Sequence, residues 1–352
     1  MAKQNDRPTL ATVASRAGVS IKTASRVLNG EKHVAASTAE KVEDAAAELG
    51  FRLNSTARRL RAGGRSPYIG VIMSDGDDPF QGRLFALLEA ELGRAGLRPV
   101  VTVTTDDPER ERAFLDECLA NDMSGICVIR SHPEAARFYA EAASADVRIV
   151  SFDPTAAGPG IDLIAGDEER VGRLAALQLL DHGHISIGVI GDHSTSPITA
   201  DRLAGIQSAF AGRSDVGWRA YMQEDARDLA SAKNVVAAWL GSRSAPSALI
   251  TLSATLTQGA IDACRRLDQW PALVGIDDFP TAHLLDVTVI DRDIGSMAAE
   301  AVRRLQGASF SGPDAGAGHG SDGAVGSGPS PRRWIVPVHM IARGSGEEPP
   351  DK

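Results

Sequence analysis

The chain has 352 residues, of which 43% are hydrophobic and 24% charged, with a formal net charge of −9. These values are typical of a soluble globular protein of two or three domains, and no apolar run reaches the ~18 residues that a membrane span needs. The first residues are polar, which argues against a signal peptide. The three cysteines, Cys118, Cys127 and Cys264, lie in apolar contexts. We therefore expect a cytoplasmic protein with reduced, buried cysteines.

The charge is divided unevenly along the chain. Residues 1–65 contain 12 Lys and Arg against 6 Asp and Glu, a net of +6, whereas the remainder contains 25 against 40, a net of −15. A positive field concentrated in a small N-terminal domain can meet the phosphates of DNA. The acidic remainder is expected to lie away from them.

Two short helical patterns meet at a tight corner, Gly18-Val19-Ser20. Thr9 can cap the first helix, and Ser20 can cap the second, which Asn29 and Gly30 end. The apolar face of the first helix is formed by Leu10, Val13, Ala14 and Ala17. This pattern indicates a helix-turn-helix, in which the start of the second helix reads the major groove of DNA. The alternative is a helical hairpin with a solvated basic face.

A third helix is predicted from the capping box Ser37-Thr38-Ala39-Glu40 to Gly50. A shorter helical segment over 54–61 carries three arginines around a single leucine, Leu60. Leu60 could pack into the neighbouring domain. Alternatively, two copies paired across a dimer axis insert Leu60 into a minor-groove step and kink the duplex. A helix this short should form only on DNA.

From Tyr68 onward, apolar strand patterns alternate with amphipathic helices, which indicates parallel sheets covered on both faces. The run is too long for one such sheet, so we expect two similar lobes with a cleft at the carboxyl ends of their strands. The strand candidates are Ile69–Met73, Pro99–Val103, Gly125–Ile129, Arg148–Phe152, Ile187–Ile190, Ala248–Leu252 and Ala272–Ile276. Helices are expected near 80–95, 108–120, 133–144, 168–181, 200–211, 229–240, 256–267 and 293–306.

Residues 307–331 are rich in Gly, Ser, Pro and Ala, and are expected to form a flexible insertion. One last strand is predicted over Trp334–Ile341, followed by a disordered tail after Gly344.

Taken together, these motifs resemble the lactose-repressor/purine-repressor (LacI) family of bacterial transcription regulators. The resemblance covers nearly the whole chain and rests on many short stretches. They are Val13-Ala14 through Arg26-Val27-Leu28-Asn29-Gly30, Ala57-Arg58-Arg59-Leu60, Ile69-Gly70-Val71-Ile72, Pro79-Phe80, Asp181-His182-Gly183-His184, Gly188-Val189-Ile190-Gly191, Arg202-Leu203-Ala204-Gly205, Val274-Gly275-Ile276-Asp277-Asp278 and Arg343-Gly344-Ser345.

The resemblance implies a small all-α helix-turn-helix DNA-binding domain over 1–53 and a hinge helix with linker over 54–66. It implies an α/β core over 67–352, built of two doubly wound parallel-sheet lobes as in periplasmic binding proteins. The first lobe would comprise about 67–163 and 292–306, and the second about 164–291 and 332–344. The partners implied are a double-stranded, near-palindromic DNA operator, a small sugar-like effector in the cleft, and a second copy of the chain in a homodimer or a tetramer. No membrane partner is implied.

The candidate DNA-binding residues lie on the two predicted helices and on the hinge. Arg26 could bind guanine through two hydrogen bonds, Ile21 could contact a thymine methyl, and Lys22 shares the face of Arg26. The full set is Thr9, Ser20, Ile21, Lys22, Thr23, Ser25, Arg26, Asn29, Ser55, Ala57, Arg58, Leu60 and Arg61.

The candidate effector-binding residues are carried over from the resemblance. Arg202 offers a guanidinium suited to vicinal hydroxyls, a carboxylate or a phosphate, and Asp277 would accept hydroxyls. The alternatives are a surface position for Arg202 and a structural cap for Asp277. The full set is Ser74, Asp75, Phe80, Asp153, Arg202, Ser253, Asp277 and Arg292.

The chain departs from the family pattern at several cleft positions. Ser253-Ala254 stands where the family often has Asn-Asp, Asp78 replaces the Asn of Asn-Pro-Phe, and Asp291-Arg292-Asp293 replaces Arg-Gln-Pro. These changes leave the identity of the effector undetermined: an effector could bind in a different pose or be absent.

The remaining alternatives are weaker. His182 and His184 flank a glycine at a predicted helix end, so we expect a capping role and no metal or cofactor. A sugar-binding protein without DNA regulation is a second hypothesis, and a carbohydrate-acting enzyme is a third. No Gly-x-Ser-x-Gly, P-loop or HExxH motif occurs, so we expect no enzyme.

Overall fold

The computed structural model of the protein describes residues 8–29, 34–51, 66–145, 147–192, 194–307 and 332–349. They fall into two compact units, one within residues 1–66 and one within residues 67–352. The hinge candidates Ser55, Ala57, Arg58, Leu60 and Arg61 lie outside the described residues, as do residues 308–331 of the predicted insertion.

The described residues of the first unit form three helices, α1 (Leu10–Ala17), α2 (Ile21–Leu28) and α3 (Ala36–Glu48). They pack around a small apolar core formed by Val13, Ala14, Ala24, Val27, Val42, Ala45 and Ala46. Each helix alone is too short to be stable in water, so this shared core holds the unit together.

The predicted caps of the first two helices are confirmed. The Thr9 side chain accepts a hydrogen bond from Thr12 N at 3.3 Å, and Ser20 Oγ accepts one from Thr23 N at 3.1 Å. The predicted capping box of the third helix is wrong. The N-cap of α3 is Ala35, which makes no side-chain bond, because Ser37 already lies inside the first turn.

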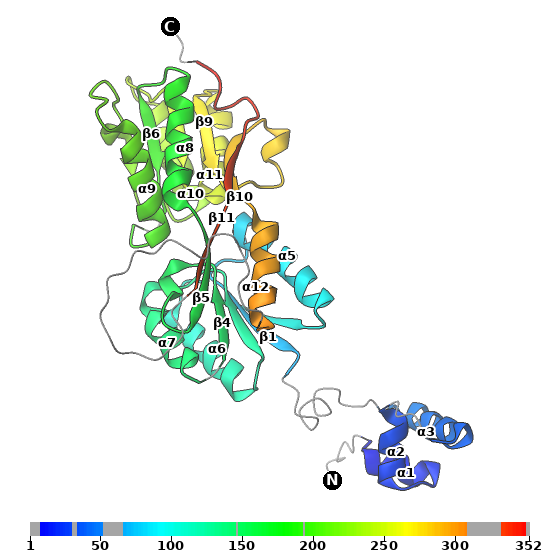
Figure 1. Cartoon of the computed structure of the whole chain (residues 1–352). Coiled ribbons are helices and arrows are strands. Elements are labelled where there is room, and N and C mark those ends of the chain that lie inside the picture. The colour runs from blue at the N-terminus through cyan, green and yellow to red at the C-terminus, as the bar shows by residue number, and fades with distance from the viewer. Residues whose placement is uncertain are drawn as a thin grey trace, which may run out of the picture. The chain divides into compact units, whose positions relative to one another are not determined.

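The second unit contains two six-stranded sheets, each with helices on both faces (Figure 1). The strands are β1 (Tyr68–Met73), β2 (Arg98–Val103), β3 (Gly125–Val128), β4 (Arg148–Ser151), β5 (Ile161–Gly166), β6 (Ile187–Ile190), β7 (Met222–Gln223), β8 (Ala248–Thr251), β9 (Ala272–Ile276), β10 (Thr288–Arg292), β11 (Arg333–Val336) and β12 (Val338–Ile341). The α-helices are α5 (Pro79–Arg94), α6 (Pro108–Ala120), α7 (Ala136–Ala143), α8 (Glu168–Asp181), α9 (Pro197–Phe210), α10 (Leu229–Leu240), α11 (Ala254–Leu267) and α12 (Ile294–Leu305).

The first lobe is built on the sheet β11-β5-β4-β3-β1-β2, in which every neighbouring pair is parallel. Helices α5 and α12 cover one face, and α6 and α7 cover the other (Figure 1). Successive residues of a strand enter opposite cores, as Val71 and Ile72 do, which explains the continuous apolar runs.

The second lobe is built on the sheet β12-β10-β9-β8-β6-β7, with α8 and α9 on one face and α10 and α11 on the other. The edge strand β12 runs antiparallel to β10, whereas the other pairs are parallel. Helices α8 and α9 approach closely because two glycines face the neighbouring backbone. A Cβ on Gly172 would lie 1.9 Å from Arg202 O, and one on Gly205 would lie 1.9 Å from Glu169 O.

The end of the chain differs from the prediction of one last strand. Pro337 divides this stretch, so that β11 pairs with β5 in the first lobe and β12 pairs with β10 in the second. A proline cannot donate a ladder hydrogen bond, which suits it to the point where the chain changes sheets. The crossing therefore lies at Pro337 and not at 332. The prediction of a disordered tail directly after Gly344 is also wrong, since Ser345 N donates to Asp286 O at 3.1 Å and Glu347 Oε2 accepts from Thr288 Oγ1 at 2.8 Å.

Three strands were absent from the predicted set. Asp162 interrupts the apolar pattern of β5, β10 ends in Asp291-Arg292, and β7 has only two residues. The other two crossings between the lobes follow β5 and β10, at Asp167 and Asp293. Both residues cap the next helix through their side chains.

Candidate functional site

The candidate DNA surface of the first unit lies at the start of α2. Ile21, Lys22 and Arg26 are exposed, with Ile21 at 55% of its maximum. An exposed isoleucine beside two cationic side chains has no role in the core and is available for an apolar contact. Thr9 and Ser20 use their hydroxyls in the caps described above, and Thr23 Oγ1 lies 2.8 Å from Ser20 Oγ. Asn29 donates to Ser25 Oγ at 3.2 Å from the C-cap of α2.

The second unit has a cleft of about 80 Å³ between its two lobes, at the carboxyl ends of the strands. This is the position that the fold predicts for a ligand. The cleft is lined by Ser74, Asp75, Asp78, Phe80, Gln81, Asp106, Ile129, Arg130, Phe152, Asp192, Ile198, Arg202, Arg227, Ser253, Thr255, Asp277 and Arg292. Seven of the eight predicted effector residues are in this set.

The eighth, Asp153, is not in the lining. It is 1% exposed, and its carboxylate accepts hydrogen bonds from Ser131 N at 3.1 Å and Thr155 N at 2.8 Å. Asp153 thus caps a short helical turn behind the cleft wall. The sequence does not distinguish a strand-end carboxylate that binds a ligand from one that binds the local backbone. In Asp153 both carboxylate oxygens accept hydrogen bonds from backbone N–H groups.

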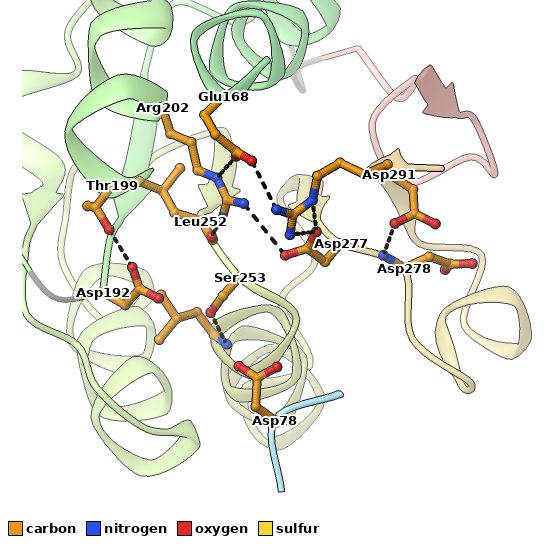
Figure 2. A network of polar contacts seen from close by, with 12 residues as sticks. Asp78, Glu168, Asp192, Thr199, Arg202, Leu252, Ser253, Asp277, Asp278 and Asp291 are labelled. Atoms are coloured by element: carbon orange, nitrogen blue, oxygen red, sulfur yellow. Dashed lines mark hydrogen bonds and ion pairs between the residues drawn. The ribbon is translucent and has the colours of Figure 1, made fainter. Parts of the chain in front are cut away.

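The floor of the cleft is a buried network of two arginines and two carboxylates from the second lobe (Figure 2). Arg202 donates from Nε to Glu168 Oε2 at 2.7 Å, and from Nη1 to the carbonyl oxygen of Leu252. Arg292 donates from Nη1 to Glu168 Oε1 at 2.9 Å and binds Asp277 Oδ1 as well. Each buried charge therefore has a partner of opposite sign, which is the condition for keeping it out of water.

Electrostatics within this network shift the pKa values of Glu168 and Arg292. Burial alone would raise the pKa of Glu168, but the charges of Arg202 and Arg292 hold that pKa below its ordinary value. Burial would lower the pKa of Arg292, yet Asp277 and Glu168 raise it above the usual value. The network therefore favours the charged forms of Glu168 and Arg292.

Glu168 is the member that sequence reasoning missed. It occupies the first position of α8, directly after the cap Asp167, where acidic residues are common because they favour the helix dipole. The close approach of α8 and α9 at Gly172 and Gly205 places it against Arg202. The motif Arg202-Leu203-Ala204-Gly205 is the available signal, since its glycine implies a tightly packed partner helix.

One side of the network retains hydrogen-bonding capacity. Arg202 Nη2 lies 3.7 Å from Asp277 Oδ2, too far for a direct hydrogen bond. Among the described residues, neither atom has a closer partner. A ligand hydroxyl between them could accept from the guanidinium and donate to the carboxylate.

The first lobe closes over this floor through α5. The Phe80 ring lies under the Arg292 guanidinium, with 3.9 Å between the ring centroid and Cζ. Arg83 reaches across to the second lobe, where it donates to the carbonyl oxygen of Asp278 and lies 3.3 Å from Asp291 Oδ2. These contacts join the two lobes directly beside the cleft, so a change in the cleft can alter their relative position.

Asp78 enters the cleft from the first lobe, as Figure 2 shows. It caps α5 by accepting a hydrogen bond from Gln81 N at 2.9 Å. Burial, together with the negative charge of Asp277, raises the pKa of Asp78 to about 6. Ser74 and Gln81 are joined beside it at 3.1 Å, and Ser253 caps α11. The cleft thus presents carboxylates, hydroxyls and an amide to a ligand.

The histidines near residue 183 have structural roles. His182 Nδ1 lies 2.8 Å from Gln178 O at the end of α8, and His184 Nε2 lies 2.6 Å from Glu348 O. Within the described ranges, no group of three or more His, Cys, Asp or Glu is placed to hold a metal ion. No helix in the same ranges is long and apolar enough to cross a membrane.

Both units match known protein families. Residues 9–54 match the family described as Bacterial regulatory proteins, lacI family, and residues 69–285 match the Periplasmic binding protein domain. The second match covers more than half of the chain.

Similar proteins include regulators from several bacteria. The sucrose operon repressor of Streptococcus mutans serotype c is 36% identical over 204 residues, which are 57% of this chain and 62% of that protein. The HTH-type transcriptional regulator DegA of Bacillus subtilis is 27% identical over 304 residues, covering 84% of this chain and 89% of DegA. The matched region spans about three fifths of the sucrose operon repressor.

The fold is also that of a solved structure. The lac repressor dimer bound to operator and the anti-inducer ONPF superimposes with a TM-score of 0.74, covering 97% of this chain and 99% of that one at 22% identity.

Proposed function

The chain belongs to the lacI family of bacterial regulatory proteins, and from this membership we propose that it is a ligand-responsive transcription regulator. It acts as a repressor that binds a near-palindromic DNA operator as a dimer. A small polyhydroxylated effector binds between the lobes of the second unit and alters the affinity for the operator. Lac repressor, whose fold it shares, was solved as a dimer on operator with an anti-inducer.

One observation carries the effector half of this proposal. Arg202 Nη2 and Asp277 Oδ2 lie 3.7 Å apart in a buried site and both keep hydrogen-bonding capacity. A hydroxyl both donates and accepts, so it satisfies the two groups at once. A sugar or polyol offers several such hydroxyls. The aromatic ring of Phe80 adds an apolar wall to the same cleft.

The DNA half rests on the first unit. We assign base contacts to Ile21, Lys22 and Arg26, at the exposed start of α2, because the N-terminal residues of a recognition helix face the base edges. The hinge candidates, with Leu60 at their centre, are assigned to the minor groove. Effector binding would change lobe closure and so the spacing of two hinge segments in a dimer.

The experiment uses the full-length protein. Operator sequences are selected from a random duplex library, and binding is then measured by fluorescence anisotropy with and without a panel of sugars and polyols. The expected result is selection of a palindrome and an affinity that changes at least about fivefold with one effector. Sugar binding without any duplex preference would favour a sugar-binding protein instead.

A further inference from the structure

A second chamber adjoins the cleft and is larger. It has a volume of about 330 Å³ and shares Asp106, Arg130 and Arg227 with the inner cleft. Its other lining residues are Ser131, His132, Pro133, Glu134, Thr155, Thr195 and Ser196. A ligand seated on Arg202 and Asp277 can therefore extend into this chamber.

Ser196 is a buried hydroxyl in the chamber that lacks a partner. It is the N-cap of the fourteen-residue helix α9, yet its side chain makes no capping bond. Only 5% of the residue is exposed, and within the described structure Ser196 Oγ has no hydrogen-bond partner. An unpaired buried hydroxyl is unfavourable, so a ligand atom that hydrogen-bonds to Ser196 Oγ would remove this cost. The helix N-terminus beside it favours negative charge.

Two guanidinium groups flank this position. Arg130 Nε lies 3.7 Å from Asp153 Oδ2, and Arg227 Nη2 lies 3.8 Å from Asp225 Oδ1. Both distances exceed a hydrogen bond, so each arginine keeps donors for a further anion. Burial would lower the pKa of Arg130, but the negative charges of Asp192, Asp153, Asp78 and Asp106 act on it and raise that pKa.

The opposite wall is held in place by a buried carboxylate. Glu111 is 0% exposed and accepts hydrogen bonds from Ser131 Oγ at 2.6 Å and His132 N at 3.1 Å, with Tyr139 OH as a third donor. His132 Nδ1 lies 3.2 Å from Glu134 N and accepts its hydrogen bond. The proton of a neutral His132 ring is then on Nε2, which gives the chamber another donor.

The two chambers differ in what they offer a ligand. Arg130 and Arg227 line both chambers, and in the inner cleft Arg202 and Arg292 are paired with carboxylates. The outer chamber adds an imidazole donor, hydroxyls and a helix N-terminus. Its acidic residues, Asp106 and Glu134, are exposed to solvent, as is Arg227, so solvent screens all three charges, whereas Ser196 is buried. Donors concentrated at one end of a site favour an anionic group there.

We propose that the outer chamber binds an anionic substituent of the effector, so that the effector is a polyhydroxylated molecule with a phosphate or a carboxylate at one end. The hydroxyls lie on Arg202 and Asp277, and the anion lies among Ser196, Arg130 and Arg227. This inference rests on the proposed effector cleft, and it adds the chemical class of the ligand.

The test is isothermal titration calorimetry of the full-length protein without DNA, using matched ligands. Glucose is compared with glucose 1-phosphate, glucose 6-phosphate and gluconate, and fructose with fructose 1-phosphate and fructose 6-phosphate. At least one anionic ligand should bind ten times more tightly than its neutral parent. The phosphate and carboxylate arms then identify the anion.

Two variants locate the anion. Arg227→Gln, at a side chain that is 65% exposed and safe to change, should reduce the preference for the anionic ligand at least fivefold. Ser196→Ala should reduce it about threefold. Arg170→Gln, which changes an exposed arginine on α8 outside both chambers, should leave it unaltered.

The inference is overturned if no anionic ligand outbinds its parent, or if Arg227→Gln keeps the full preference. Because the calorimetry uses no DNA, this failure is distinct from failure of the proposed function. If a neutral sugar binds tightly and changes operator affinity, only the proposed anion site is contradicted. If the protein selects no operator sequence, the proposed regulatory function is contradicted, and the preference for an anionic ligand can still be measured.

Discussion

Arg292 donates two hydrogen bonds to the same oxygen of Asp277, from Nε at 3.1 Å and from Nη2 at 2.6 Å. Asp277 has a left-handed backbone conformation, with φ of +67°, which a short polar side chain tolerates. The second oxygen of the carboxylate remains on the side of Arg202. One oxygen of the Asp277 carboxylate thus binds Arg292, whereas the other is available to a ligand in the cleft.

Asp277→Ala should destabilise the second unit by about 3 kcal/mol or more, because it leaves two buried arginines with one carboxylate. The measurement is the unfolding transition of the core in urea. Asp262→Ala is the matched control: Asp262 pairs with Arg266 and Lys233 at the surface, so its loss should cost much less than the loss of Asp277. Equal losses in the two variants would contradict the role of the network.

Gly205→Ala should lower the melting temperature and weaken effector binding together. The new Cβ would meet Glu169 O and force α8 from α9, at a cost of about 1–3 kcal/mol. Arg202 would then lose its register with Glu168. Gly93→Ala is the control: it lies in α5 with nothing within 4 Å of a Cβ, and should be neutral or stabilising. A harmless Gly205→Ala would show that the helices do not need this contact.

Asp78→Asn should change the pH dependence of stability. The pKa of Asp78 is raised to about 6 from 3.8, so the folded unit binds a proton that the unfolded chain has lost between these values. Stability from this group is present below about pH 4 and is lost as the pH rises through 6.

The Asn variant cannot ionise and still accepts the helix-capping bond. It should therefore be more stable than the parent at pH 7.5, by about 1–2 kcal/mol, and similar at pH 4. Melting temperatures across this range check the sign. Parallel curves for the two proteins would argue against a perturbed Asp78.

Arg83→Gln should loosen the contact between the lobes, because Arg83 bonds Asp278 and Asp291 from the opposite lobe. Its side chain is 28% exposed, so the effect on stability should stay below about 1 kcal/mol. The expected change is a larger radius of gyration in X-ray scattering without effector. Arg94→Gln, at an exposed arginine of the same helix, is the control. Identical scattering from both variants would refute this role.

Lys22→Ala should weaken operator binding and reduce the slope of log affinity against log salt by about one unit, since one fewer counterion is released. Binding is followed by anisotropy at several salt concentrations. Lys41→Ala removes an equal charge from the exposed side of α3 and should leave the slope unchanged. An unaltered slope for Lys22→Ala would place that side chain away from the duplex.

Local signals predicted the parts of the structure that depend on neighbouring residues. Thr9 and Ser20 were found as caps because a cap acts within one turn of helix. Arg202, Asp277 and Arg292 were assigned to one cleft by the family resemblance, and the structure brings them together there. Glu168 was missed because its partners lie 34 and 124 positions away, whereas its local setting already explains an acidic residue.

Edges of the sheets were harder to predict than their centres. Central strands such as β8 are buried on both faces and read as continuous apolar runs. Strand β10 carries Asp291 and Arg292 because its end belongs to the cleft, and Pro337 separates two strands that the apolar pattern joins. Strands are recognised from apolar patterns. Polar residues of the cleft and the crossing between lobes both interrupt these patterns.

Because the chain changes sheets at Pro337, residues 333–341 contribute one strand to each of the two lobes. Strand β11 is an edge of the first sheet and β12 an edge of the second. A stop codon just before residue 333 would uncover both edges in a single event, and exposed edges invite aggregation. A peptide carrying the missing residues could, in turn, restore both lobes when supplied from a separate gene.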